Sequence, residues 1–454
     1  MDRIFQRCGI LPRCFVMARA SPIDIASGAA KPREAKLRGA PIPAAPCKQK
    51  NVSRGERDAE SFSTGFWGEN RPLFRNPARH AAERLAASFP FDIIRPENGT
   101  ADMTAKPIAP SFVRDIPEWK IPEAVLAFLL QDRTTGRNLL WATDDYAARG
   151  PGFGANDEMH LRQIADAGNP VIRPRVDKNA AEQRQRAVRR AEIFTPSWIC
   201  NKQNNLVDAA WFGWKKPASS PFNAEKGTSW KTTSHPVRFP KGRTWQEYVK
   251  APRLEVSCGE APYLASRYDA VDGAMLPVED RIGLLDRKLR IVTENAGKND
   301  PQDWFHYAKR AVQSCYGFDW QGDNVLLARE NVLMTVVETW NRVFFGEESS
   351  AFEHFESGNP ALPGLDDLLK LAEIVAWNVW QMDGTKFVVP MSCKPEKKVE
   401  TLLDGTEAVT ESDCRGCRLK DASAHTGTYS TIMDWRTGNP MRFVDLTTKG
   451  MHHA

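Results

Sequence analysis

The chain of 454 residues combines 41% hydrophobic residues with a mean hydropathy of −0.48, which indicates a globular protein of two or three domains in water. No stretch approaches the roughly 20 apolar residues of a membrane-spanning helix, and arginines interrupt the start "MDRIFQRCGILPRCFVMARA" too often for a secretory signal. The composition therefore argues against a membrane partner and predicts a cytoplasmic location. The net charge of +5 permits nucleic-acid binding without requiring it.

Residues 1–102 are rich in Arg, Ala, Pro and Ser and show no helical or strand periodicity, a composition that predicts disorder. From Met103 onward the sequence looks like the start of an ordinary folded protein. Two interpretations stay open. Either translation begins at Met103 and the first segment is an upstream extension, or the chain carries a genuine flexible tail.

Residues 103–190 are expected to form an accessory region ahead of the main domain. Their patterns predict a helix over 117–131, a strand in "NLLWATDDY" (138–146) and a glycine-rich turn in "RGPGFGAND" (149–157). A basic run follows, which contains Arg173, Arg175, Lys178, Arg184, Arg186, Arg189 and Arg190. A run of this kind is typical of a solvated helix face, and contact with phosphate groups is the alternative.

Two elements further along the chain have a spacing of about sixty residues between them. Phe194-Thr195-Pro196 has the cap and first-position proline of a helix start. The stretch "RLEVSCGEAPYL" (253–264) predicts a strand, a tight turn at Gly259 and then a helix. Small residues at such a strand end let the backbone approach a ligand closely.

This pair of elements resembles the amino-methyltransferases of restriction-modification systems. Those enzymes carry Phe/Tyr-Thr-Pro ahead of an Asp-Pro-x-Cys-Gly-x-Gly-x-Phe-Leu strand and turn. The acid, the Cys-Gly pair, the aromatic residue and the leucine match here, whereas Val256 and Ala261 replace the proline and the second glycine. From about Leu139 to near the C-terminus, the chain is similar to the proteins called restriction endonuclease subunit M.

The resemblance implies that S-adenosylmethionine binds at this turn. Glu255 and the turn from Gly259 to Ala261 would hold its methionine end, and the Phe-Thr-Pro element would close over it. A carboxylate that ends the next strand would hold the ribose; Asp319 in "SCYGFDWQGD" is the preferred candidate and Asp286 the competing one. The implied cofactor-binding residues are Phe194, Thr195, Pro196, Glu255, Cys258, Gly259, Ala261, Tyr263 and Asp319.

Catalysis is the weak part of the resemblance. Methylation of an exocyclic amine requires a flipped base, fixed hydrogen-bond acceptors and a stacked aromatic ring, which the family supplies with an Asn-Pro-Pro-Tyr type tetrapeptide. The sequence contains no Pro-Pro pair. Asn378 and Trp380 are the best catalytic substitutes, although the helical period of residues 365–384 favours a core helix. Either a second subunit brings the motif or the reading frame is truncated.

Residues 391–454 form a final segment that contains cysteines. Cys414 and Cys417 make a Cys-x2-Cys knuckle, and Cys393 and His425 could complete a structural zinc site. Reduced surface cysteines are the alternative. The end, "IMDWRTGNPMRFVDLTTKGMHHA", is expected to hold an edge strand that could pair with a partner.

We therefore expect an α/β protein whose residues 191–390 form a mostly parallel, Rossmann-like methyltransferase sheet. The accessory region 103–190 precedes it and the segment 391–454 follows. The implied function is the modification subunit of a restriction-modification system, which methylates DNA at an exocyclic amine, with adenine N6 favoured over cytosine N4. The alternative is a non-catalytic subunit that senses the cofactor and organises a nuclease on DNA.

Overall fold

The computed structural model describes residues 121–164, 171–190, 192, 194–296, 300–346, 352–401 and 407–448. The expected disordered extension, Met103 and the start of the predicted helix at 117–131 lie outside the described residues. Within the described residues, none of the helices has the length and apolar character that crossing a membrane demands.

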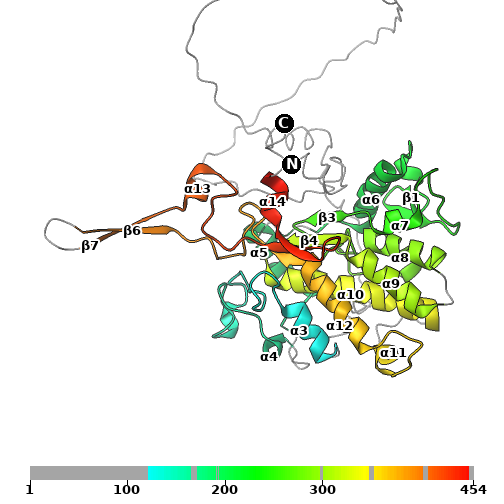
Figure 1. Cartoon of the computed structure of the whole chain (residues 1–454), viewed down its shortest axis with the longest axis horizontal. Coiled ribbons are helices and arrows are strands. Elements are labelled where there is room, and N and C mark those ends of the chain that lie inside the picture. Colours follow the sequence, from blue (N-terminus) through cyan, green and yellow to red (C-terminus); the bar gives the residue numbers. More distant parts are fainter. Residues whose placement is uncertain are drawn as a thin grey trace, which may run out of the picture. The chain divides into compact units, whose positions relative to one another are not determined.

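A three-stranded parallel sheet lies at the centre of the fold (Figure 1), in the order β3 (Arg253–Val256), β4 (Cys315–Asp319) and β5 (Val379–Gln381). Arg253 is paired with Cys315, and Gly317 with Val379. Helices connect the strands, as parallel pairing requires. The chain therefore has an α/β fold. The connecting helices are α8 (Leu284–Asn295) and α9 (Pro301–Val312) before β4, and α10 (Gly322–Phe345), α11 (Glu353–Glu356) and α12 (Leu365–Asn378) before β5.

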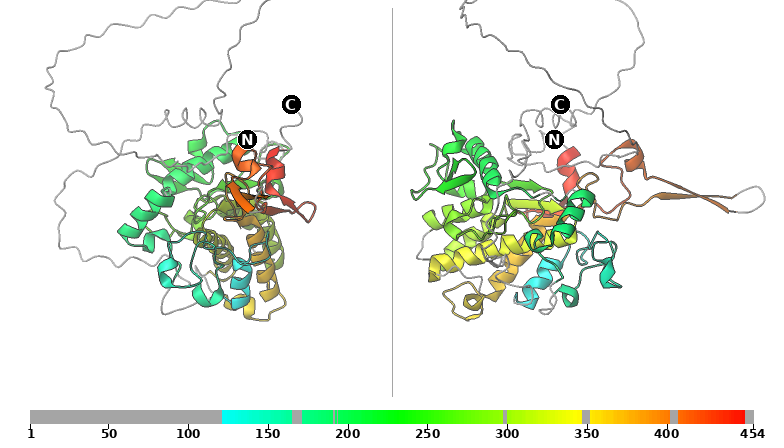
Figure 2. Two further views of the ribbon diagram at one scale, coloured as in Figure 1. Left: turned by 90° about the vertical axis from the view of Figure 1, so that its left-hand side faces the viewer. Right: turned by 180° about the vertical axis from the view of Figure 1, so that it is seen from behind.

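Helix α10 is the central helix of the hydrophobic core. Most of its residues are buried, and it contacts α8, α9, α12, β4 and β5. Figures 1 and 2 show α10 and α12 side by side next to the sheet. A helix that is buried on nearly every side is expected to be mostly apolar, but α10 also buries polar side chains, such as Asn331, which donates to the Glu260 carbonyl at 2.9 Å. The predicted helical spacing of residues 365–378 is confirmed as α12, but Val379–Gln381 is a strand.

Helix α3 (Glu123–Leu130) packs against α12 and shares the core of the sheet. The buried guanidinium of Arg329 in α10 donates to the carbonyls of Leu129, Gln131, Ala376 and Val379, at 2.6 to 2.9 Å. One side chain thus satisfies the last carbonyls of two helices and one of β5. The described part of residues 121–190 is therefore built into the core of the sheet.

The strand predicted in residues 138–146 does not form. The segment has only isolated bridges, from Asn138 to Gln131 and from Leu140 to Glu158. The backbone N–H and C=O of Leu140 instead pair with the side-chain amide of Gln381, at 3.0 and 2.8 Å. Because a side chain satisfies this backbone, a strand ladder is not needed there.

The remaining elements lie outside the three-stranded sheet, and the two-stranded ribbon of β6 (Glu396–Thr401) and β7 (Glu407–Ser412) projects away from it (Figure 1). The expected C-terminal edge strand is a hairpin in which β8 (Thr431–Asp434) pairs with β9 (Asn439–Arg442), with Asp434 opposite Asn439. Before β3 come η2 (Ala147–Arg149), α4 (Leu161–Ile164), η3 (Arg175–Asp177), α5 (Ala180–Arg190), α6 (Ser197–Phe212), η4 (Pro217–Ser219), β1 (Asn223–Lys226), β2 (Ser229–Thr232) and α7 (Trp245–Val249). Elsewhere lie η5 (Val278–Asp280), β6 (Glu396–Thr401), β7 (Glu407–Ser412), α13 (Arg415–Leu419), β8 (Thr431–Asp434), β9 (Asn439–Arg442) and α14 (Phe443–Thr448).

Candidate functional site

The turn that follows β3 has an unusual backbone. Ser257, Gly259 and Ala261 have φ values of 53°, 52° and 61°. The left-handed region costs a residue with a Cβ about 1–3 kcal/mol, and such strain collects at functional sites. Ala261 stands where the family pattern has its second glycine, and it keeps the backbone conformation that a glycine would adopt more easily.

The helix predicted directly after this turn is absent. Ala265 donates to the carbonyl of Ala261 at 2.9 Å, which makes one helical turn, and the next α-helix, α8, begins at Leu284. The side chain of Arg267 pairs with Glu338 of α10, and the Ser266 N–H donates to Asp286 at 2.9 Å. These tertiary bonds hold the chain in an irregular path where local spacing favoured a helix.

Asp319 lies at the end of β4, beside the turn, as its sequence position predicted. Its Oδ2 accepts from the Gly259 N–H and its Oδ1 from the Gln321 N–H, both at 3.0 Å. Burial raises the pKa of Asp319 to about 6, against the lowering effect of these N–H groups. Asp286 lies instead in the first turn of α8, where it accepts from the Gly283 N–H at 3.0 Å. Of the two candidates, only Asp319 ends a strand at the turn.

Glu255 holds the same turn from within β3. Its two carboxylate oxygens accept from the N–H groups of Tyr263 and Leu264, at 3.3 and 3.1 Å. Burial raises the pKa of Glu255 to about 8, because desolvation outweighs these hydrogen bonds. Glu255 therefore orders the turn's backbone. Direct contact between Glu255 and the methionine end of a cofactor stays a prediction.

The Phe-Thr-Pro element does lie against the turn. The Phe194 ring is 3.7 Å from the position that a Cβ on Gly259 would occupy, and the Arg175 guanidinium lies 5.1 Å from the centre of the same ring. Helix α6 begins at Ser197, one residue later than predicted, so that Pro196 and not Thr195 is its N-cap residue. The Cys200 thiol contacts the Thr195 carbonyl at 3.6 Å.

Cys258 and Tyr263 occupy buried positions in the turn. Tyr263 packs with Cys200 and Ile282. The Cys258 N–H donates to Phe318 at 2.9 Å, and burial raises the pKa of its thiol well above the usual value. A thiol with a raised pKa is a poor nucleophile, so Cys258 has a packing role here.

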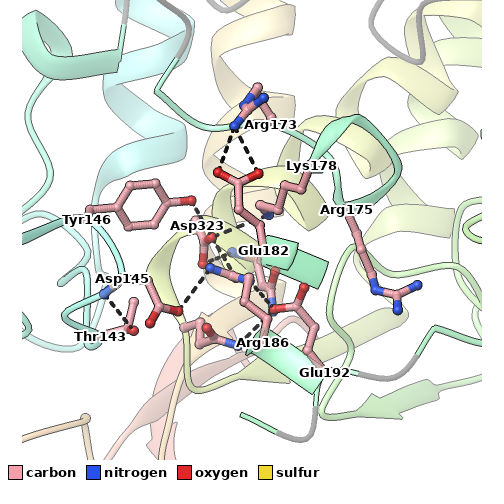
Figure 3. A network of polar contacts seen from close by, with 12 residues as sticks. Thr143, Asp145, Tyr146, Arg173, Arg175, Lys178, Glu182, Arg186, Glu192 and Asp323 are labelled. Carbon is pink, nitrogen blue, oxygen red and sulfur yellow. Dashed lines mark hydrogen bonds and ion pairs between the residues drawn. The ribbon is translucent and has the colours of Figure 1, made fainter. Parts of the chain in front are cut away.

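A buried ion network covers the start of α10 (Figure 3). Asp323 is fully buried, and its Oδ2 accepts from the Tyr146 hydroxyl and from Arg186, both at 2.7 Å. Arg186 also donates through Nε to Glu192 at 2.6 Å and through NH1 to Asp145 at 3.3 Å. The basic run was expected to be a solvated face or a phosphate contact. For Arg186 both interpretations were wrong, because it holds buried carboxylates.

The strand ends carry more buried carboxylates than buried cations. Burial raises the pKa of Glu260, next to Gly259, even though the Lys178 ammonium lowers it. All of these carboxylates accept hydrogen bonds, but they outnumber the cations beside them, so a further positive charge would be favoured there. The buried carboxylates are Glu192, Glu255, Glu260, Asp319 and Asp323, and the buried cations near them are Lys178 and Arg186.

Asn378 and Trp380 do not form a site of their own. The Asn378 amide donates to the carbonyls of Val312 and Cys315, at 2.7 and 3.0 Å, and accepts from the Trp435 indole at 2.6 Å. Trp380 is buried in β5, with its ring 5.5 Å from that of Phe318. Since the polar atoms of Asn378 are engaged within the protein, its geometry gives it a structural role and argues against a catalytic one.

Cys393, Cys414, Cys417 and His425 form a cluster with the dimensions of a metal site. The Sγ of Cys393 lies 3.4 and 3.9 Å from those of Cys414 and Cys417. The three Sγ atoms lie 3.5 to 3.7 Å from the His425 Nδ1. Tetrahedral zinc, with bonds of about 2.3 Å to sulfur and 2.0–2.1 Å to nitrogen, gives edges of about 3.8 and 3.5 Å. The cluster therefore fits zinc in its closed, structural form.

Local backbone features assemble this cluster. A Cβ on Gly416 would lie 2.6 Å from the His425 N, so a glycine is required inside the knuckle. The Tyr429 hydroxyl accepts from the His425 N–H at 2.8 Å and fixes the loop. Burial raises the pKa of the Cys414 thiol, but N–H groups of Cys417 and Thr426 lower it more, to about 5. The pKa of its neighbour Cys417 is raised, to about 11, by burial and by Cys414 and Cys393, so Cys414 is the member of this pair that ionises more easily to the thiolate that binds metal.

The residues that sequence reasoning missed are Lys178, Glu192, Gln321 and Asp323. Lys178 was part of the basic run, and the other three carry no motif. The available signal was the "DWQGD" stretch, which places two acids around a strand end.

A cavity of about 740 Å³ lies apart from these residues and is lined by others, which include Gly152, Phe153 and His160. No protein-family model, curated protein or solved structure matches the chain.

Proposed function

We propose that the chain is the modification subunit of a restriction-modification system and binds S-adenosylmethionine at the Gly259 turn. The observation that carries this proposal is the junction of the Gly259 N–H with Asp319, at the carboxyl ends of two adjacent parallel strands. Ligands of open α/β sheets bind at this edge. Phe194 from the Phe-Thr-Pro element lies against the same glycine.

The chemistry of the residues fits this cofactor. S-adenosylmethionine carries a sulfonium and an ammonium group against one carboxylate, and the strand ends hold surplus buried carboxylates. In this proposal Asp319 accepts from the ribose hydroxyls and the turn approaches the methionine end. The cofactor would supply the methyl group, and the chain would bind and orient it for transfer to an exocyclic amine of DNA, with adenine N6 favoured.

The alternative function, a non-catalytic subunit, is favoured by one observation. Asn378 is the best substitute for the family's catalytic residue, and its amide is held within the core. The chain would then sense the cofactor and organise a nuclease on DNA, or a second subunit would bring the base-binding motif. Both versions require the cofactor to bind.

We also propose that the Cys3His cluster holds a structural zinc ion. The ion would join the two ends of the β6–β7 hairpin, because Cys393 precedes β6 and Cys414 follows β7. The Arg418 side chain in α13 contacts Glu396, Ser412 and Asp413 at the base of the same hairpin. All four ligands come from the protein, which is typical of structural and not of catalytic zinc.

The proposal is tested by titration calorimetry of the full chain with S-adenosylmethionine. We expect saturable binding to the unmodified chain and a loss of at least tenfold in affinity for Asp319→Ala. Asp272→Ala in the 269–274 turn is the matched control and should bind as the unmodified chain does. Absence of binding to the unmodified, folded chain would contradict both versions of the function.

A further inference from the structure

Three buried polar atoms near the strand ends have no hydrogen-bond partner among the described residues: Lys178 Nζ, Glu192 Oε1 and Gln321 Oε1. The exposed fractions of these residues are 7%, 6% and 5%. Leaving a buried polar group unpaired costs about 1–3 kcal/mol, so native proteins rarely do so without a reason. Lys178 Nζ forms an ion pair with the Asp323 carboxylate at 3.8 Å, which is too long for a hydrogen bond.

These atoms adjoin the Gly259 turn. The Gln321 N–H binds Asp319, and the Gln321 Nε2 donates to the Glu192 Oε2 at 3.3 Å. Lys178 lies close enough to Glu260, the residue after Gly259, to lower the pKa of its carboxyl against the effect of burial. Figure 3 shows Lys178 directed toward Asp323, with Arg186 and Glu192 beside it. One segment, residues 172–196, thus brings a cation and an acid to the same strand ends.

The unpaired atoms have the polarity that a free amino acid group requires. An ammonium group offers three donors and a carboxylate offers only acceptors. Lys178 Nζ has unused donors, and Glu192 Oε1 and Gln321 Oε1 are unused acceptors. Arg186 already gives Asp323 and the other oxygen of Glu192 a charged partner. Charge-assisted hydrogen bonds to such a ligand are the strongest that these side chains could make.

Building on the proposed cofactor, we propose that Lys178 and Glu192 recognise the amino acid end of S-adenosylmethionine. Lys178 Nζ donates to the α-carboxylate, and Glu192 Oε1 accepts from the α-ammonium. Gln321 Oε1 provides a second acceptor for the ammonium group. Asp319 is left to the ribose, so the two ends of the cofactor are recognised by different segments of the chain.

The test compares three ligands: S-adenosylmethionine, its decarboxylated form, which lacks only the α-carboxylate, and 5′-methylthioadenosine, a neutral thioether that lacks both the amino acid group and the sulfonium charge. Calorimetry with the full chain should give the highest affinity for S-adenosylmethionine. Lys178→Met should lose 10- to 100-fold in affinity for it and less than threefold for the decarboxylated form. Glu192→Gln should weaken both of these ligands and leave 5′-methylthioadenosine unchanged.

Two controls separate the possible failures. Arg189→Met, an exposed change in the same segment, should leave all three affinities unchanged, and Lys178→Arg should restore the preference for the carboxylate. Equal loss for all three ligands in Lys178→Met would show that Lys178 supports only the fold. If the unmodified chain binds S-adenosylmethionine and its decarboxylated form equally, the inference is wrong although the proposed function stands. If it binds none of the three, the proposed function itself is wrong.

Discussion

The Gly259 N–H donates to the Asp319 carboxylate across 3.0 Å, and this bond joins the turn after β3 to the end of β4. Residue Cys258 is bonded to β4 as well, through the Phe318 carbonyl at 2.9 Å. The backbone of the turn and the carboxylate therefore form one unit. A change that shifts the turn also shifts Asp319, so both must be considered in every mutational test of the site.

The first prediction concerns Gly259→Ala. Its φ of 52° is unfavourable for any residue with a Cβ, so the substitution should lower the free energy of unfolding by about 1–2 kcal/mol. Chemical denaturation measures the loss. The added Cβ meets the Phe194 ring at 3.7 Å, an ordinary contact, so the chain should still fold. Gly259→Val would strain the same turn further, which makes it a poorer probe of the ligand site.

Gly242→Ala is the matched control for this variant. Gly242 has a φ of 81°, and a Cβ there would meet nothing within 4 Å. It should lose a similar amount of stability and keep the affinity for S-adenosylmethionine, whereas Gly259→Ala should lose at least tenfold. Equal affinities in the two variants would remove the turn from the binding site.

The second prediction concerns pH. The pKa values of Asp319 and Glu255 are raised in the folded chain, to about 6 and about 8 from the usual 3.8 and 4.5. Between each pair of values the folded chain binds more protons than the unfolded one. The stability that these groups contribute is thus complete below about pH 4 and is lost as pH rises to about 8. The negative charges of Glu192 and Asp323 add to the effect of burial in raising the pKa of Asp319.

The affinity for a cationic ligand should depend on pH in the opposite way to folding stability. A positive ligand favours the ionised carboxylates, so S-adenosylmethionine should release protons on binding near pH 7 and bind more tightly as pH rises from about 6 to 8. Calorimetry in two buffers of different protonation enthalpy counts the protons. Glu255→Gln should reduce the number released. Proton uptake on binding would contradict the assignment.

The sequence predicted the parts of the fold that depend on local periodicity. The apolar run of Cys315–Phe318, the helix that follows it and the acid between them were all read correctly, because a buried strand and a buried helix have distinct spacings. Tertiary hydrogen bonds determine the parts of the fold that local periodicity did not predict. Leu140 lacks a strand because Gln381 satisfies its backbone, and Asn378, the last residue of α12, is held by amide hydrogen bonds to the carbonyls of Val312 and Cys315.

The metal site, too, could be predicted from the sequence only in part. The knuckle at Cys414 and Cys417 is visible in sequence, whereas the approach of Cys393 and His425 depends on Gly416 and on the Tyr429 hydroxyl. Lys178 and Glu192 could not be selected in advance, since a charged run has no period that separates buried members from exposed ones. Only packing distinguishes Arg186 from Arg184 and Arg189 on the same helix.

The third prediction compares a buried and an exposed arginine of α5, Arg186 and Arg189. Arg186→Met leaves Asp323 and Glu192 buried without their main cationic partner and should cost about 3–5 kcal/mol of stability. Arg189→Met, exposed on the same helix, should change stability by less than about 0.5 kcal/mol. Urea unfolding of both variants measures the difference. Similar, small effects in the two would mean that the ion network does not contribute to stability.

The fourth prediction concerns zinc. The purified chain should contain about one equivalent, and Cys417→Ala should contain less than about half. Cys200→Ala, which changes a buried thiol outside the cluster, should keep the metal. Removal of zinc by a chelator should speed tryptic cleavage at Lys397, whose hairpin the ion is proposed to close. Metal content below about half an equivalent in the unmodified chain would end the claim.

The last prediction concerns catalysis. Nothing among the described residues offers both a free acceptor for the target amine and a ring for the base in the family's arrangement, and placement of the reacting groups can lower a barrier by several kcal/mol, up to about 7–11. The chain alone should therefore bind S-adenosylmethionine and, weakly and in a salt-sensitive way, DNA. It should transfer no labelled methyl group to duplex DNA until a partner subunit is added. Asn378→Ala should lower stability through its lost core bonds, so any activity must be compared at equal folded fraction. Robust transfer by the chain alone, lost in folded Asn378→Ala, would show that this asparagine is catalytic and that no partner is needed.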